Sequence, residues 1–383
     1  MKRTPVWNII ALFVVTRLTL MMVTYVGYIL LTAPKYSSTP VDTTKFFLLW
    51  DHWDAARYIN IAQHGYQTKY DLAFFPLFPL LTKILAHLFG GYGYLLIGTL
   101  ISNAALLASL FILYQLATET SGASGEQVGR RTLLYLCIFP TALFFFAAYN
   151  ESLFLVFTAG TFLALRRQKW WLAGLLGLLA ALTRSTGILL VLPVLYELWQ
   201  ARENVFSSIK NSLLGFSPLV LIPLGTFLYC VYCWHVSGDP LAFVTVQAHW
   251  DRHFSPPWQG LWQSLVELFW LQPFGSFFEV HILLDLIAYI AFIVLTIVGW
   301  RKLRASYTLW AATLLLFTSL SPAIAQHDAL VSSQRFVLEV FPCFITLAIL
   351  GVKHPRLHQA VMIVFPTLLA TLSLIFVMNL WMV

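Results

Sequence analysis

Apolar runs long enough to cross a membrane recur from one end of this chain to the other, and they limit what it can fold into. An α-helix of about 20 apolar residues spans a hydrocarbon core of about 30 Å. Of the 383 residues, 59% are hydrophobic and 10% are charged, whereas soluble domains carry about 25% charged residues. Because backbone groups inside a bilayer must be hydrogen-bonded within the protein, helices are expected. The sequence predicts an all-α polytopic membrane protein with about ten to eleven transmembrane helices.

The predicted spans are joined by mostly short loops. Candidate spans lie at 6–32, 93–118, 132–149, 151–166, 170–198, 212–236, 281–300, 305–322, 336–351 and 359–380. The segment 72–90 contains Pro76 and Pro79, which is more typical of a broken or interfacial helix than of a clean span. Two topologies stay open. In one, 72–90 crosses fully and 170–198 is one long helix; in the other, 72–90 re-enters the membrane and 170–198 is a short hairpin broken near Arg184. The broken version is favoured, because it keeps the arginine-rich loops inside. We expect a single transmembrane domain over 1–383.

The basic residues orient the spans, because cytoplasmic loops of membrane proteins carry an excess of Lys and Arg. Placing Lys2 and the Arg301–Arg304 run inside puts two long loops outside, at about 33–71 and 237–280. The apolar run after Lys2 predicts a retained signal anchor with a cytoplasmic N-terminus. The basic residues are spread over short loops, so we expect no nucleic-acid partner.

The first outer loop contains an acidic and aromatic segment, WDHWDAARY, from Trp50 to Tyr58. Asp51 and Asp54 are three residues apart and would share one face of a helix. Acidic residues at a bilayer boundary indicate a functional site, and a carboxylate beside an acceptor hydroxyl can remove its proton as it attacks. The alternative is an interfacial helix whose acids face water, with Asp54 paired to Arg57 or Tyr58.

Arginines and polar loop residues are candidate ligands for a phosphate and a sugar. Arg184 lies inside an apolar stretch, and Arg335 begins a span after an outer loop. The planar guanidinium group binds phosphate bidentately. The alternatives are a helix-end or snorkelling role for Arg184 and an interfacial anchor for Arg335. In the second outer loop, Gln247 and Trp250 suit sugar hydroxyls and ring faces, and a plain solvated loop is the alternative.

Glu151 follows Asn150 between two apolar runs, so it either pairs with Arg17 in the first span or belongs to a substrate site. The four cysteines lie in apolar runs, and the Cys230–Cys233 pair lacks two further zinc ligands nearby. We therefore expect no cofactor and assign no metal site. A divalent metal stays an open alternative, which the ligand set in the sequence does not support.

Several segments, taken in order, resemble a known family. The first outer loop reads HWDAARY, then IAQHGY, and AFFPLFP follows at 73–79. Weaker matches follow at Tyr149–Phe154, Leu182–Gly187, Phe243–Trp250 and Arg335–Phe336, with Thr186 where Asn is usual. Together these segments resemble the PIG-V mannosyltransferases (GPI mannosyltransferase II), members of the GT-C membrane glycosyltransferases, over about residues 10 to 345.

The resemblance implies a GT-C-like bundle with a short interfacial helix in the first outer loop. It also implies a polyprenyl-phosphate sugar donor, such as polyprenyl-phosphate mannose, a lipid or glycan acceptor, and an inverting displacement. Asp54 matches the position of the family's essential aspartate. The other expected substrate-binding residues are Asp51, His52, Trp53, Tyr58, Glu151, Gln247 and Trp250.

The compact loops differ from the eukaryotic pattern, so we expect a multi-pass protein of a prokaryotic plasma membrane with its active site on the outer face. A transporter or flippase of anionic or glycosylated lipid is the alternative, because Arg17, Arg184 and the proline-broken 72–90 also suit that class. The paired acids in an outer aromatic loop favour the enzyme. A non-catalytic scaffold does not explain why polar residues concentrate on one face.

Overall fold

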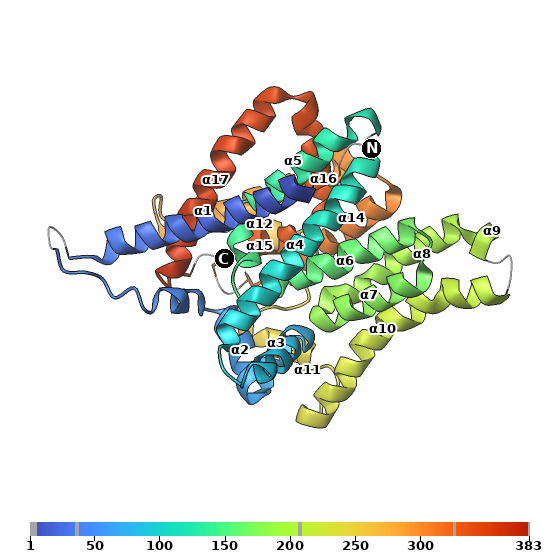
Figure 1. Cartoon of the computed structure of the whole chain (residues 1–383), viewed down its shortest axis with the longest axis horizontal. Helices are drawn as coiled ribbons and strands as arrows, with labels where there is room; N and C mark the ends of the chain where they lie inside the picture. The colour runs from blue at the N-terminus through green and yellow to red at the C-terminus, as the bar shows by residue number, and fades with distance from the viewer. Residues whose placement is uncertain (1–5, 35–37, 121, 206–208, 325–326, 382–383) are drawn as a thin grey trace. The chain divides into compact units, whose positions relative to one another are not determined.

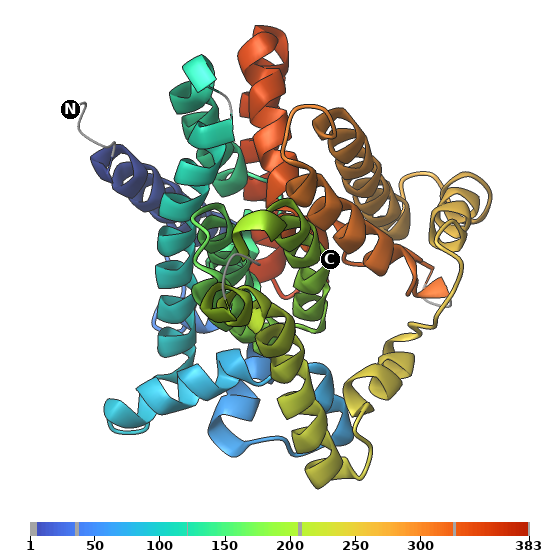
Figure 2. The ribbon, with the colours of Figure 1, turned by 90° about the vertical axis from the view of Figure 1, so that its right-hand side faces the viewer.

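Every regular element in the described part of the chain is a helix. The computed structural model describes residues 6–34, 38–120, 122–205, 209–324 and 327–381. Both views of the ribbon show coils joined by irregular segments (Figures 1 and 2), and the extended feature within these ranges is an isolated bridge between Arg252 and Ala323. The all-α prediction is confirmed. Lys2, which oriented the N-terminus, lies outside the described residues.

Within those ranges, five helices are long and apolar enough to cross a membrane. They are α1 (Val6–Thr32), α4 (Tyr94–Thr120), α10 (Ile209–Ser237), α13 (Phe277–Gly299) and α17 (Pro355–Val377). Only 22% to 44% of each helix's most apolar window is buried, so most of these apolar side chains face outward. Soluble proteins rarely expose apolar surface on that scale. The protein is therefore a multi-pass integral membrane protein, as predicted.

The structure has fewer full-length helices than the ten to eleven spans expected from about 20-residue apolar runs. A sixth crossing is counted only if Ser333–Glu339 and α16 (Phe341–Lys353), which are bent by 85° at their junction, form one span. The other helices in these ranges have at most 16 residues, and at about 1.5 Å per residue they fall short of a core of about 30 Å. They include α3 (Leu77–Leu88), α5 (Gly125–Cys137), α6 (Glu151–Arg166), α7 (Trp170–Thr183), α8 (Val191–Gln200), α9 (Arg202–Val205), α12 (Gln259–Val266) and α14 (Ala305–Ser319). Apolar composition does not detect the breaks between such helices.

The predicted break near Arg184 is confirmed. α7 ends at Thr183, Arg184 is extended with φ −151°, and a short 3-10 helix, η5 (Ser185–Leu190), leads into α8. A Cβ on Gly187 would lie 2.5 Å from backbone atoms of Ala180. The turn after Arg184 therefore requires glycine, because it returns against the end of α7.

The segment 72–90 is a broken helix, as its prolines predicted. A 3-10 helix, η2 (Lys69–Ala73), precedes α3, which has 12 residues. At a rise of about 1.5 Å per residue, α3 is about 18 Å long and is too short to cross the membrane as a straight helix.

Contacts between residues divide the chain into two compact units. Unit 1 comprises Met1–Gln63, Pro79–Ser152 and Leu347–Met382, and unit 2 comprises His64–Phe78 and Leu153–Thr346, together with Val383. Asp54 belongs to unit 1, whereas Arg184 and Arg335 belong to unit 2.

In unit 1, Arg17 has a structural position in α1. Its side chain is 5% exposed, and its guanidinium group donates to the carbonyl oxygens of Cys137 at 3.2 Å and Ala142 at 3.4 Å. Cys137 is the last residue of α5, and the carbonyls at a helix C-terminus attract a cation. Arg17 thus bonds backbone carbonyls, and Glu151 is not among its hydrogen-bond partners.

In unit 2, α7 and α10 pack closely and lie side by side (Figure 1). A Cβ on Gly174 of α7 would lie 3.0 Å from the Cα of Pro218 in α10, and one on Gly225 would lie 2.6 Å from the carbonyl oxygen of Leu178. Small residues that let backbones approach are typical of helix pairs in membranes. This close pairing fixes α7, and with it the position of Arg184.

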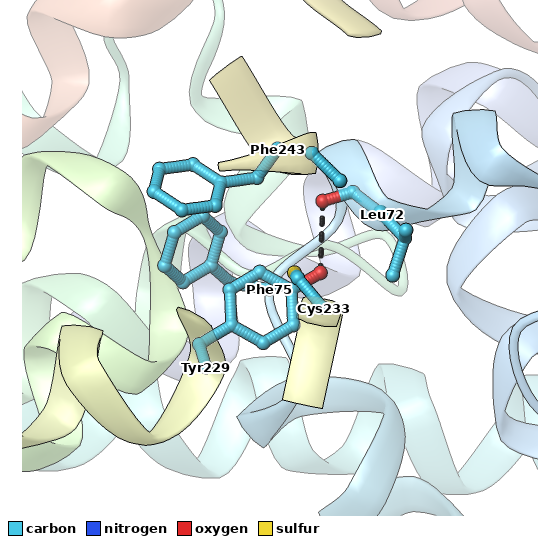
Figure 3. Close-up of a cluster of buried hydrophobic side chains, with 6 residues drawn as sticks. Leu72, Phe75, Tyr229, Cys233 and Phe243 are labelled. Atoms are coloured by element: carbon cyan, nitrogen blue, oxygen red, sulfur yellow. Dashed lines mark hydrogen bonds between the residues drawn. The ribbon is translucent and has the colours of Figure 1, made fainter. Parts of the chain in front are cut away.

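The irregular segment Phe74–Pro76 follows the first outer loop and is called the FFP corner below. A buried cluster anchors it within unit 2 (Figure 3). The cluster consists of Leu72, Phe75, Tyr229, Cys233, Ala242 and Phe243. Tyr229 of α10 donates its hydroxyl to the carbonyl oxygen of Leu72 at 2.8 Å, and Tyr66 donates to that of Phe74 at 2.7 Å. Backbone groups that lie outside regular helices are therefore hydrogen-bonded, as membrane depth requires.

Candidate active site

In the acidic segment of the first outer loop, the helix α2 (Asp54–His64) begins only at Asp54, so Asp51 lies outside it. Trp53 has a left-handed backbone with φ +55°, so the helix cannot extend back through it. Asp54 is the first residue of α2, where the helix dipole favours a negative charge, and Asp51 lies in the turn before it. The prediction that Asp51 and Asp54 share one helical face is therefore wrong.

Two polar atoms of the residues just before Asp54 are buried and have no hydrogen-bond partner in the part of the chain that the structure describes. They are Oδ1 of Asp51 and Nε2 of His52. Burial raises the pKa of the Asp51 carboxyl, and nearby His52 partly opposes this change. Burial lowers the pKa of the His52 imidazole. Buried polar atoms are seldom left unsatisfied, so this turn is suited to a ligand with hydroxyl groups.

The raised pKa of Asp51 predicts a pH-dependent stability. The ordinary pKa of an aspartate carboxyl is 3.8. The raised pKa means that Asp51 binds its proton more tightly in the folded protein than in the unfolded chain. Ionising Asp51 therefore destabilises the folded state. Stability should fall as the pH rises from 3.8 towards the higher pKa of the folded state. We expect the Tm of wild type, relative to Asp51→Asn, to decrease as the pH rises from 3.8.

Asp42 is a control of opposite sign for that measurement. Hydrogen bonds from Thr44 lower the pKa of this exposed carboxyl, so any stability it contributes is lost as the pH falls. A difference between wild type and Asp51→Asn that is constant over the same range would contradict the raised pKa.

Aromatic residues of the loop pack inside unit 1. Trp50 is fully buried, with its ring 4.6 Å from that of Phe146, and Tyr58 is 4% exposed. Neither lies in a headgroup-like environment, because the loop folds onto the helices. Trp53 is 37% exposed and contacts Trp381, so it is the candidate substrate aromatic with an accessible face.

The Tyr149–Ser152 motif contacts the segment Asp51–Asp54, which is called the acidic turn below. Tyr149 donates its hydroxyl to the carbonyl oxygen of His52 at 3.4 Å, a long hydrogen bond, and its own carbonyl accepts from Ser102 at 2.7 Å. Glu151 is the first residue of α6 and is fully buried. Two of the family-like segments, separated by about 100 residues of sequence, therefore meet in unit 1.

In unit 2, Arg184 is held by a buried ion pair. Its Nε lies 2.8 Å from Oε1 of Glu339, and the two side chains are 15% and 4% exposed. The guanidinium also lies 5.5 Å from the ring centre of Phe336, and Arg252 lies 5.3 Å from the same ring. Arg184 is thus a helix-end arginine with an acidic partner, and it does not snorkel to an interface.

Arg252, to which the sequence assigned no specific role, bonds the backbone of unit 2. Its Nη1 donates to the carbonyl oxygen of Ser321 at 3.2 Å and its Nη2 to that of Val331 at 2.8 Å. Arg335, in α15 (Ser333–Phe336), is 5% exposed. A buried Arg335 is not the interfacial anchor that was the alternative for it.

The second outer loop lies on the end of the first within unit 2. Gln247 and Trp250 belong to the 3-10 helix η6 (Val246–Trp250), which follows α11 (Ala242–Thr245). The ring of His249 lies 4.1 Å from that of Tyr70, and Trp250 contacts Phe74 edge-on. Gln247 donates to the carbonyl oxygen of Phe243 at 3.3 Å. The parts of both loops that belong to unit 2 are therefore in contact.

Comparison with known proteins assigns the family. The family profile described as Mannosyltransferase (PIG-V) matches residues 6–235, more than half of the chain. The chain belongs to the PIG-V mannosyltransferase family. The match confirms the resemblance found in the sequence motifs.

Curated relatives extend this assignment. The PIG-V chain is 30% identical over 236 residues to the GPI alpha-1,6-mannosyltransferase 2 of Mus musculus, covering 54% of this chain and 47% of that protein. It is 27% identical over 231 residues to the GPI mannosyltransferase 2 of Schizosaccharomyces pombe, covering 55% and 49%. The chain spans about half the length of these relatives.

Among solved structures, the apo form of the Archaeoglobus fulgidus oligosaccharyltransferase is similar to the PIG-V chain. Its TM-score is 0.47 at 12% identity, and the match covers 96% of this chain and 56% of that one.

The family match divides the candidate residues of this PIG-V protein. Asp54, Glu151 and Arg184 lie inside 6–235. The candidates beyond it are Gln247, Trp250 and Arg335. Family membership therefore supports the acidic turn more strongly than the second outer loop.

Proposed function

We propose that this protein transfers mannose from a polyprenyl-phosphate donor to a hydroxyl of a lipid or glycan acceptor. The observation that carries the proposal is the acidic turn in the family-matched region. There, Asp54 begins α2 directly after two buried polar atoms without hydrogen-bond partners. An acceptor hydroxyl would satisfy such atoms. The names of the curated relatives, GPI mannosyltransferases, support the reaction class.

In this proposal, Asp54 is the general base. Its carboxylate takes the proton of the acceptor hydroxyl while that oxygen attacks the anomeric carbon of the donor. The bond from the anomeric carbon to the phosphate oxygen breaks on the opposite face, and the lipid phosphate leaves. The attack inverts the carbon, so a β-linked donor gives an α-linked product.

We further propose Arg184 and Arg335 as ligands of the donor phosphate. A leaving phosphate gains negative charge, which fixed positive groups stabilise. Arg184 keeps the ion pair with Glu339 through Nε, so a phosphate would bind the edge of the guanidinium group formed by its two Nη atoms. Asp51, His52, Trp53, Tyr58 and Glu151 are the remaining candidates in the first part of the site, and Gln247 and Trp250 are those in the second.

We place this activity on the outer face of a prokaryotic plasma membrane. The compact loops support this location, because longer loops are the eukaryotic pattern. The structure weakens one argument for a flippase, since Arg17 bonds backbone carbonyls within unit 1 instead of lining a pathway.

The test uses the full chain, purified and returned to lipid vesicles. Polyprenyl-phosphate mannose, polyprenyl-phosphate glucose and a nucleotide-linked mannose are offered in turn, each with a radiolabelled sugar. Release or transfer of mannose from the polyprenyl phosphate alone is the expected result. Movement of the labelled lipid across the bilayer without any sugar release would replace the transferase with a flippase.

A further inference from the structure

Three polar side chains form a buried cluster in unit 2, apart from the residues discussed so far. His281 and Asp285 are one turn apart near the start of α13, and Asp328 lies in the segment before α15. The Nδ1 of His281 is 2.9 Å from Oδ2 of Asp328 and 3.7 Å from Oδ2 of Asp285. One ligand atom from each residue lies within 4.8 Å of the others. The three side chains are 6%, 0% and 4% exposed, in that order.

Backbone donors aim both carboxylates into this cluster. Oδ1 of Asp285 accepts from the amide of Gln334 at 2.6 Å, and Oδ1 of Asp328 accepts from the amide of Leu330 at 3.1 Å. Each residue therefore directs Oδ2 towards His281. The Oδ2 of the fully buried Asp285 has no hydrogen-bond partner among the described residues. Fixing one carboxylate oxygen in this way orients the other as a metal ligand.

Charge gives a reason for an ion at this place. Two ionised carboxylates so close together and out of water would repel each other, and a cation between them would offset that repulsion. Arg252, which acts electrostatically on Asp285, is hydrogen-bonded to two carbonyl oxygens. A divalent cation would neutralise both carboxylates and accept a nitrogen from neutral His281.

The distances also fit. Metal bonds of about 2.1 Å to imidazole nitrogen and carboxylate oxygen place neighbouring ligand atoms about 3.0 to 3.5 Å apart. The separations of 2.9 Å and 3.7 Å from His281 Nδ1 lie close to this range. Small side-chain rotations would suffice. One imidazole and two carboxylates suit Zn²⁺ or Mn²⁺.

We propose that His281, Asp285 and Asp328 bind a divalent transition-metal cation. The ion would link the first turns of α13 to the segment 328–334, which leads directly into Arg335. Its role is to fix that segment. The proposal does not rest on the transferase activity, because its tests measure metal and stability.

The first test is the metal content of the full chain, purified in detergent without chelator and then dialysed. We expect about one equivalent of zinc or manganese, a lower Tm after EDTA, and recovery when Zn²⁺ or Mn²⁺ is added. Asp285→Asn and Asp328→Asn should reduce the bound metal at least about tenfold. The matched control is Glu197→Gln, which alters a buried carboxylate bound to Arg304 and Ser306 and should keep the metal.

A second measurement uses only the wild type, so it gives a result even if the Asp285 and Asp328 variants fail to fold. Wild-type protein stripped of metal is titrated with Co²⁺, and the visible absorption of the ion is followed. A saturable spectrum of nitrogen- and oxygen-coordinated cobalt, displaced by Zn²⁺, is expected. The proposal would be overturned if the wild type bound neither zinc, manganese nor cobalt and its Tm were unchanged by EDTA. In that case, a proton shared between the carboxyl groups of Asp285 and Asp328 would account for their proximity.

Discussion

Replacing Asp54 with Asn should remove the proposed mannose transfer while leaving the protein folded. Loss of a general base lowers turnover by about 100- to 10,000-fold. Asn retains the size of the side chain at the first position of α2, so stability should change only by the lost charge–dipole attraction, about 0.3 to 1 kcal/mol. The measurement is initial transfer rate in vesicles, together with Tm.

The control for this variant is Asp42→Asn, which alters an exposed carboxylate in the same loop. It should transfer mannose at the wild-type rate. If Asp54→Asn also retained turnover near wild type, Asp54 would not be the base, and the role of the acidic turn would be to bind the acceptor.

Replacing Glu339 with Gln should strongly destabilise unit 2. Its carboxylate lies 2.8 Å from Nε of Arg184, and both groups are largely buried. Removing one partner of a buried pair leaves an uncompensated charge and costs about 3 to 5 kcal/mol. The expected result is a clearly lower Tm, or loss of folded protein in detergent.

Glu126→Gln is the matched control, because Glu126 pairs with Arg130 at 2.6 Å but both side chains are about half exposed. Exposed pairs contribute only about 0 to 1 kcal/mol, so this Tm should barely move. The double variant Arg184→Met with Glu339→Leu should recover much of the stability, because no charge is then left buried. Equal shifts for Glu339→Gln and Glu126→Gln would mean that burial does not set the strength of these pairs.

The sequence predicted features that depend on neighbouring residues. Apolar runs indicated helices, Pro76 and Pro79 indicated the corner before α3, and Arg184 inside an apolar run indicated a break. The acidic turn was found because acids and aromatics rarely follow each other between apolar segments. In each case a few adjacent residues determine the local structure.

What the sequence did not predict depends on residues that are distant along the chain or on backbone conformation. The register of α2 is set by the left-handed Trp53, which is rare for a bulky residue. The pairing of Arg184 with Glu339 joins two segments far apart in the chain. His281 and Asp328 are 47 residues apart, so a search for metal ligands at short spacing could not associate them.

The tyrosine contacts of the FFP corner have a consequence for how the protein is made. The carbonyl oxygen of Leu72 accepts from a hydroxyl 157 residues later in the chain. A chain leaves the ribosome from its N-terminus at about 5 to 20 residues per second, so the corner is synthesised well before Tyr229. Until α10 has entered the membrane, the carbonyl oxygen of Leu72 must bond water or another partner. The corner after the first outer loop therefore completes its fold late, during or after the insertion of α10.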